Sequence, residues 1–240
     1  MTRRTSRSAR VVMLLAAPVL VAMAASCSSE HESAAIAPYG TDSTVAVPPT
    51  VPPASGAATD PAGTIVVHRL AMVGDSITQG AQPDLEKAFS GIGLDDVTFN
   101  AEQGRRMTAS NSITSGVEGI KKVLAKGAPP DLWVIALGTN DVANYQPQDY
   151  ATAINEVLAA IPAGAPVLWV DCYLDQYPDL SKQFDATLRQ VLAARGNARV
   201  VDWATVAAED GVLRDGIHPS GFGIDEFTRR VSSAVADWAS

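Results

Sequence analysis

The chain has 240 residues, of which 47% are hydrophobic, and a formal net charge of −8. This length suits one domain with additional segments or two small domains, and the apolar share is sufficient for a sizeable core. Because lysines and arginines are few and not clustered, the basic surface of nucleic-acid-binding proteins is absent, and we expect no nucleic-acid partner.

Residues 1–26 have the pattern of an export signal. Four arginines within residues 3–10 precede an uncharged, almost wholly apolar run from Val11 to Ala25. This run is shorter than the roughly 20 residues that span a bilayer, and Pro18 interrupts it. The pattern favours a cleaved signal peptide over the alternative of an uncleaved signal anchor.

Cys27 directly follows Ala24, Ala25 and Ser26. This order resembles a bacterial lipobox, in which the cysteine is acylated and becomes the new N-terminus. We therefore expect lipidation at Cys27 and anchoring on the outer side of the cytoplasmic membrane. The alternative is ordinary cleavage after Ala24 and secretion. The second cysteine, Cys172, lies far away in an apolar run, so we expect a buried, inert thiol and no disulfide.

Residues 27–63 are rich in alanine, proline, serine and threonine and show neither helical nor strand periodicity. This composition predicts a disordered, partly extended tether. From residue 64 onward, apolar runs of strand length alternate with segments of helical period. We therefore assign a single folded domain to residues 64–240.

The predicted strands are Leu70–Val73, Val97–Ala101, Leu132–Leu137, Val167–Cys172 and Ala198–Val201. Helical spacing recurs within residues 113–124, 154–161, 184–192 and 224–238. This alternation predicts an α/β fold with a five-stranded parallel sheet covered on both faces. Ligands in such sheets bind beyond the carboxyl ends of the strands, so functional residues should directly follow strands.

Ser76 lies in the stretch VGDSITQG, just after the first predicted strand. A tight turn into a helix would present its hydroxyl at the carboxyl edge of the sheet. The N–H groups at the start of that helix would stabilise a developing oxyanion. The alternative is an ordinary helix N-cap serine.

A serine nucleophile needs a proton acceptor, usually histidine. His31 lies in the tether and His68 at the opposite end of the first strand, so His218 in DGIHPS is the only well-placed one. Asp215 precedes it by three residues and can orient its imidazole. The alternative for this stretch is a helix-start turn capped by Ser220.

Two further stretches follow predicted strands. Asn140 in ALGTND can donate an amide N–H to an oxyanion, or simply belong to a turn. Gly104 in NAEQGRRM can bring its backbone N–H close to a ligand. Arg105 and Asp141 are candidate substrate contacts, although Arg105 or Arg106 can equally face water.

Other catalytic signatures are absent from the sequence. No P-loop, no G-x-S-x-G elbow and no histidine or cysteine cluster with metal-ligand spacing occurs. We therefore expect no cofactor and no metal.

The four stretches GDSIT, AEQGRRM, GTND and DGIHPS, in this order, resemble the blocks of the SGNH, or GDSL-type, hydrolases. The resemblance covers essentially all of residues 64–240. It implies a flavodoxin-like three-layer α/β/α fold and ester hydrolysis without a cofactor. It also implies a Ser76–His218–Asp215 triad and an oxyanion hole formed by Ser76, Gly104 and Asn140.

The stretches NAEQGRRM, VVDWA and DGIHPSGFG look more like the SGNH domains associated with O-acyltransferases of envelope polysaccharides. The first hypothesis is therefore an envelope-anchored, monomeric esterase or deacetylase acting on short acyl esters. The second is an O-acyltransferase of envelope glycans that works with a separate membrane partner. The third is a catalytically inactive glycan-binding module.

Overall fold

The computed structural model describes residues 66–108 and 113–239. The predicted signal peptide, Cys27 and the tether over residues 27–63 therefore lie outside the described residues. All elements below belong to the unit formed by residues 50–240.

Five parallel strands form one sheet, in the order β2-β1-β3-β4-β5. The strands are β1 (Arg69–Gly74), β2 (Asp96–Ala101), β3 (Leu132–Ala136), β4 (Val167–Val170) and β5 (Ala198–Val201). Leu70 of β1 is aligned with Val97 of β2 on one side and with Leu132 of β3 on the other. The predicted five-stranded parallel sheet is confirmed.

β4 ends at Val170, two residues earlier than predicted. The reason is Asp171, whose carboxylate accepts hydrogen bonds from the backbone N–H groups of Trp203 (2.6 Å) and Ala204 (2.7 Å). The polar side chain thus turns the chain toward the segment that follows β5. The next residue, Cys172, has the expected buried thiol.

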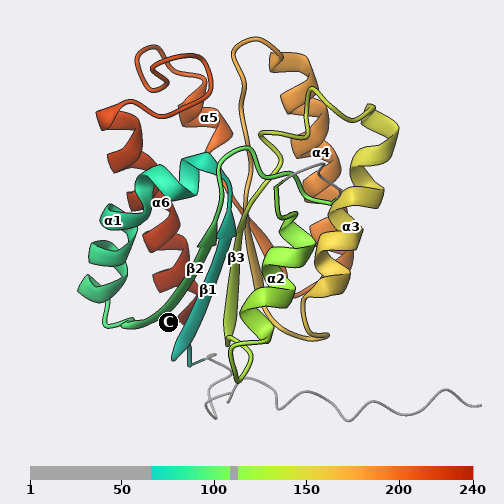
Figure 1. Cartoon of the computed structure of the whole chain (residues 1–240). Helices are drawn as coiled ribbons and strands as arrows, with labels where there is room; N and C mark the ends of the chain where they lie inside the picture. The colour runs from blue at the N-terminus through green and yellow to red at the C-terminus, as the bar shows by residue number, and fades with distance from the viewer. Residues whose placement is uncertain (1–65, 109–112, 240) are drawn as a thin grey trace, which may run out of the picture. The chain divides into compact units, whose positions relative to one another are not determined.

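Helices cover both faces of the sheet (Figure 1). The helices α1 (Ser76–Gly91) and α6 (Gly221–Ala239) lie on one face, and α2 (Gly116–Leu124), α3 (Tyr150–Ala160) and α4 (Pro178–Arg195) lie on the other. Two short elements, η1 (Pro147–Asp149) and α5 (Ala204–Ala207), complete the set. The result is the expected three-layer α/β/α fold.

Alternation along the strands divides the core into two layers. Leu70 and Met72 of β1 pack with α1 and α6, whereas Ala71 and Val73 pack with the opposite layer of helices. All four are buried, so β1 is apolar on both faces, as a central parallel strand should be.

The strand order places β1 between β2 and β3. The chain passes from β1 to β2 on one side of β1 and then forms β3 on the other side. In a flavodoxin-like sheet this β1/β3 junction is the topological switch point, where ligands bind at the carboxyl edge. Ser76 follows β1 and Asn140 follows β3. Within the described residues, no helix is long and apolar enough to cross a membrane.

Candidate active site

Ser76 is the first residue of α1, and Asp75 is its N-cap. The Asp75 carboxylate accepts a hydrogen bond from the Ile77 N–H at 2.9 Å. The alternative in which Ser76 itself caps the helix is therefore wrong. Because Asp75 satisfies the cap, the Ser76 hydroxyl is available for another partner, and its Oγ lies 3.1 Å from His218 Nε2.

Gly74 makes the tight turn before Ser76 possible. A Cβ at this position would collide with the side chain of Thr78, one turn along α1. Any larger residue would therefore push the helix start away from the end of β1. The close approach keeps Ser76 at the carboxyl edge of the sheet.

His218 is held by Asp215 through both backbone and side chain. The Asp215 Oδ1 accepts hydrogen bonds from the N–H groups of His218 (2.7 Å) and Ile217 (3.1 Å), and its Oδ2 lies 2.9 Å from His218 Nδ1. The backbone N–H of His218 is the largest cause that lowers the pKa of Asp215 to about 2. The carboxylate is thus ionised at neutral pH, so Nδ1 carries the proton and Nε2 faces Ser76 as an acceptor.

The helix-start interpretation of DGIHPS is also correct. Ser220 precedes α6, and its Oγ accepts a hydrogen bond from the Gly223 N–H at 3.2 Å. The same stretch therefore begins a helix and carries the histidine. The two interpretations are compatible.

Gly104 lies in the turn after β2 with a φ of +74°. A Cβ there would come within 3.1 Å of Ile113 Cδ1. A left-handed backbone in a crowded turn requires glycine.

Arg105 is buried, with 2% of its surface exposed, and does not reach a substrate. Its guanidinium donates hydrogen bonds to the carbonyls of Gly74 (3.2 Å), Thr114 (3.0 Å) and Asn100, and to the Glu102 carboxylate (3.2 Å). The expected substrate contact is therefore replaced by a positioning role. Arg105 ties the turn that carries Gly104 to the ends of β1 and β2.

Asp141 is likewise enclosed, with 0% of its surface exposed. Its two carboxylate oxygens accept from the Met107 N–H at 3.0 and 3.2 Å. Burial is the main cause that raises its pKa to about 7, opposed by the Met107 N–H and reinforced by the charge of Asp75. The side chain joins the turn after β3 to the turn after β2, so the expected substrate contact is not compatible with its placement.

The side-chain amide of Asn140 points toward Asp75 and the backbone of Arg105. Its Nδ2 donates to Asp75 Oδ2 at 3.2 Å and to the Arg105 carbonyl at 3.1 Å. Both amide N–H groups thus have protein partners. Donation to an oxyanion requires that one of them is shared or turned.

Asp75 is the residue of the site that sequence reasoning missed. It is 1% exposed, and burial raises its pKa to about 6, while the Ile77 N–H lowers it. The carboxylate links the start of α1 to Asn140. The sequence signal for this role is an aspartate, a residue type that commonly caps helices, immediately before the serine.

The geometry defines a class of chemistry. A hydroxyl, an imidazole and a carboxylate joined in series are suited to nucleophilic attack on a carbonyl carbon. Among the described residues, no group of three or more histidine, cysteine, aspartate or glutamate side chains could hold a metal ion.

Comparison with known proteins identifies the class. The model of the GDSL-like lipase/acylhydrolase family matches residues 72–224. The chain therefore belongs to this family, and the protein is a hydrolase that acts on ester bonds. A search of curated proteins finds no match.

Solved structures with the same fold include two esterases and the catalytic domain of an O-acetyltransferase. The aryl esterase of M. smegmatis aligns with a TM-score of 0.60 at 18% identity, covering 71% of this chain and 99% of the esterase. Est24, a carbohydrate acetylesterase from Sinorhizobium meliloti, gives 0.58 at 19% identity, covering 70% and 99%.

The C-terminal catalytic domain of peptidoglycan O-acetyltransferase A from Streptococcus pneumoniae gives a TM-score of 0.53 at 19% identity, covering 72% of this chain and 93% of that domain. At these identities the likeness concerns the fold.

Proposed function

We propose that this protein is an exported serine esterase that removes short acyl groups, in particular acetyl, from a cell-envelope glycan. The observation that carries the proposal is the continuous series of hydrogen bonds from Ser76 Oγ to His218 Nε2 (3.1 Å) and from His218 Nδ1 to Asp215 Oδ2 (2.9 Å). The series needs no rearrangement to remove a proton from Ser76.

The proposed reaction has two steps. Ser76 Oγ attacks the ester carbonyl while His218 Nε2 takes its proton, and the imidazolium is stabilised by Asp215. The imidazolium then protonates the leaving alcohol oxygen, which leaves an acyl group on Ser76. In the second step His218 Nε2 takes a proton from a water molecule whose oxygen attacks the acyl carbon. The bond to Ser76 Oγ then breaks, His218 returns the proton to Oγ, and the carboxylic acid leaves.

The oxyanion that forms in both steps needs hydrogen-bond donors. We assign the backbone N–H groups of Ser76 and Gly104 and the side-chain amide of Asn140. Loss of one such donor typically costs roughly 3–4 kcal/mol of barrier. Asn140 can contribute without leaving Asp75 if the N–H now bonded to the Arg105 carbonyl is shared with the substrate oxygen.

A short acyl group on a larger polar molecule fits the exposure of the site. The side chains of His218 and Asp215 are 29% and 50% exposed, so a bulky alcohol can approach the imidazole. The similarity in fold to a carbohydrate acetylesterase and to a peptidoglycan O-acetyltransferase domain supports an acetylated glycan as substrate.

The first test compares wild type with Ser76→Ala on p-nitrophenyl acetate. We expect the variant to lose turnover while it keeps the far-UV circular dichroism of wild type. Ser232→Ala, on the exposed side of α6, is the matched control and should retain full activity. Absence of turnover in wild type would instead favour the third hypothesis, an inactive glycan-binding module.

Acyl chain length separates a short-chain esterase from a lipase. We expect acetyl and propionyl esters to be cleaved faster than octanoyl esters. Faster cleavage of the octanoyl ester would contradict the short-chain assignment.

O-acyl transfer is the second candidate function. The same exposure of His218 that admits a bulky leaving alcohol also admits a sugar hydroxyl in place of water. Incubation with an acetyl donor, with and without chitotriose, distinguishes the two. Free acetate as the main product supports the esterase, and acetylated chitotriose as the main product supports a transferase acting with a separate membrane partner.

Export and anchoring are proposed from the N-terminal sequence. Cleavage before Cys27 and lipidation of its thiol would place the domain on the outer side of the cytoplasmic membrane. Cys27→Ser should release the protein from the membrane fraction. Release of the unaltered protein into the medium would support the alternative, secretion.

A further inference from the structure

A groove of about 390 Å³ lies beyond the carboxyl ends of β4 and β5, between α4 and α5. Its lining includes Tyr173, Lys182, Asp185, Arg189 and Thr205. The volume is in the range of small-molecule sites. None of these residues belongs to the triad or to the oxyanion hole.

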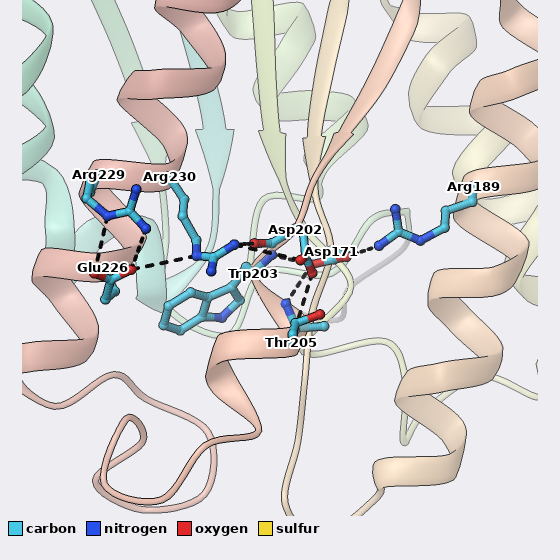
Figure 2. A network of polar contacts seen from close by, with 9 residues as sticks. Asp171, Arg189, Asp202, Trp203, Thr205, Glu226, Arg229 and Arg230 are labelled. Carbon is cyan, nitrogen blue, oxygen red and sulfur yellow. Dashed lines mark hydrogen bonds and ion pairs between the residues drawn. The ribbon is translucent and has the colours of Figure 1, made fainter.

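One wall of the groove is fixed by an ion pair between buried Asp171 and half-exposed Arg189, which Figure 2 shows. Asp171 accepts a hydrogen bond from Arg189 Nη2 at 2.7 Å, in addition to the two N–H groups after β5. The Arg189 side chain is 52% exposed, whereas that of Asp171 is 0% exposed. The ion pair orients the guanidinium, and within the described part of the chain its other N–H groups have no hydrogen-bond partner and can face a ligand.

Asp185 supplies a second polar group. Its Oδ1 accepts a long hydrogen bond from the Cys172 N–H at 3.3 Å, and within the described residues its Oδ2 has no hydrogen-bond partner. Burial, followed by the negative charge of Asp171, raises the pKa of Asp185 to about 8. Near neutral pH the group is therefore mostly protonated and can both donate and accept a hydrogen bond.

The charges around the groove are largely balanced. Arg189 is paired with Asp171, Asp202 lies 3.7 Å from Arg230, and Lys182 lies 3.7 Å from Asp179. Figure 2 shows Asp202 and Thr205 beside the Asp171–Arg189 pair, with Asp202 Oδ1 accepting a hydrogen bond from the Thr205 N–H at 3.3 Å. An anionic or cationic ligand would gain little here, whereas a neutral ligand with several hydroxyl groups matches the donors and acceptors.

The remaining lining residues are small, namely Ser181 and three alanines. Ala186, Ala204 and Ala208 contribute methyl groups to the groove. A pyranose ring has an apolar face of carbon-bound hydrogens and a rim of hydroxyl groups. The combination of methyl groups with Asp185, Arg189 and Thr205 suits such a ring.

The groove is a neighbour of the catalytic residues on the same edge of the sheet. Asp171 and Cys172, which directly precede the groove residue Tyr173, line a small internal cavity of about 10 Å³ whose lining includes Asp75 and Thr139. In addition, Asp175, two residues after Tyr173, donates its N–H to the carbonyl of Gly216 at 3.0 Å, next to the triad. A chain of linked rings could therefore occupy both places.

We propose that this groove is a subsite that binds a neutral sugar ring of the oligosaccharide whose ester is presented to Ser76. The inference rests on the proposed function, because it names a second contact of the same substrate. It gives the polar residues after β4 and on α4 a part in substrate recognition.

The test measures binding in the full chain carrying Ser76→Ala, so that turnover is not required. The probes are two neutral trisaccharides, chitotriose and xylotriose, titrated by isothermal calorimetry. Ala186→Phe places a large side chain in the groove. Ala194→Phe, two turns further along the same helix, lies in a different groove of about 340 Å³ and is the matched control.

We expect at least one trisaccharide to bind, Ala186→Phe to weaken binding roughly tenfold or more, and Ala194→Phe to leave it within twofold. Asp185→Asn, which keeps the side-chain volume, should also weaken binding and serves if Ala186→Phe fails to fold. Binding of neither sugar, or equal affinity in all variants, overturns the subsite. Failure of the proposed function would appear separately, as absence of acetyl ester cleavage by the wild-type chain.

Discussion

Replacement of Asp75 by asparagine should slow acyl transfer to Ser76 while leaving the start of α1 capped. Asparagine caps helices about as well as aspartate, so its single side-chain oxygen can still accept from the Ile77 N–H. Its NH2 group then replaces the oxygen that lies 3.2 Å from Asn140 Nδ2. Two donors face one another, and the Asn140 amide loses the acceptor that orients it.

The magnitude follows from the kind of bond that is lost. A hydrogen bond to a charged group contributes about 1.5–3 kcal/mol. If all of this is lost in the transition state, the change corresponds to a decrease in kcat of roughly 10- to 150-fold. KM should change little, because the Asn140 amide is assigned to the oxyanion and not to ground-state binding.

The assay is steady-state cleavage of p-nitrophenyl acetate at pH 8, well above the pKa of about 6 that burial gives Asp75, so the wild-type carboxylate is ionised. A double-mutant cycle with Asn140→Ala isolates the coupling. In the Asn140→Ala background, Asp75→Asn should cost less than about threefold. An equal cost in both backgrounds, or no cost in either, would refute the orienting role.

Two other changes test the positioning of the site, and a third tests the burial of Asp185. Arg105→Met leaves several buried carbonyls without a donor and should lower the free energy of unfolding by about 3–5 kcal/mol; an unchanged urea midpoint would contradict this. Gly104→Ala should reduce kcat more than about tenfold, because it crowds a turn at φ +74°, whereas Gly93→Ala at φ +81° has open space and should affect only stability. For Asp185, the folded-state pKa of about 8 lies above the ordinary 3.8 of the unfolded chain. The folded protein therefore binds this proton more tightly than the unfolded chain does. The stability that the group contributes is lost as pH rises from 3.8 through about 8. Asp185→Asn should therefore raise the melting temperature relative to wild type by more at pH 8 than at pH 5, and parallel pH curves would contradict the burial of its charge.

The three central strands were predictable because each one is a continuous apolar run, whereas the edge strands β2 and β5 include polar residues and are only partly buried. β1, β3 and β4 are buried on both faces, and such strands need no alternation to be recognised. The position of Ser76 after β1 and of Asn140 after β3 then follows from the rule for carboxyl edges. The separation of Asp215 and His218 by three residues is local, so their contact could also be expected from the sequence.

Other features depend on tertiary contacts that local sequence does not show. The sequence predicts Arg105 as a substrate contact or a water-facing cation, because nothing nearby in sequence indicates that three backbone carbonyls converge on it. The role of Asp75 does not follow from the sequence, because a shift of one residue in the helix start decides whether aspartate or serine is the cap. The early end of β4 depends on N–H groups more than 30 residues away.

The most direct test of the account is to identify the acyl-enzyme. The wild-type protein, mixed with p-nitrophenyl acetate and quenched in acid during turnover, is digested and analysed by peptide mass spectrometry. The account predicts an acetyl group on Ser76 of the wild type and none in Ser76→Ala. Turnover that persists in Ser76→Ala, or acetyl groups only on other residues, would contradict Ser76 as the nucleophile.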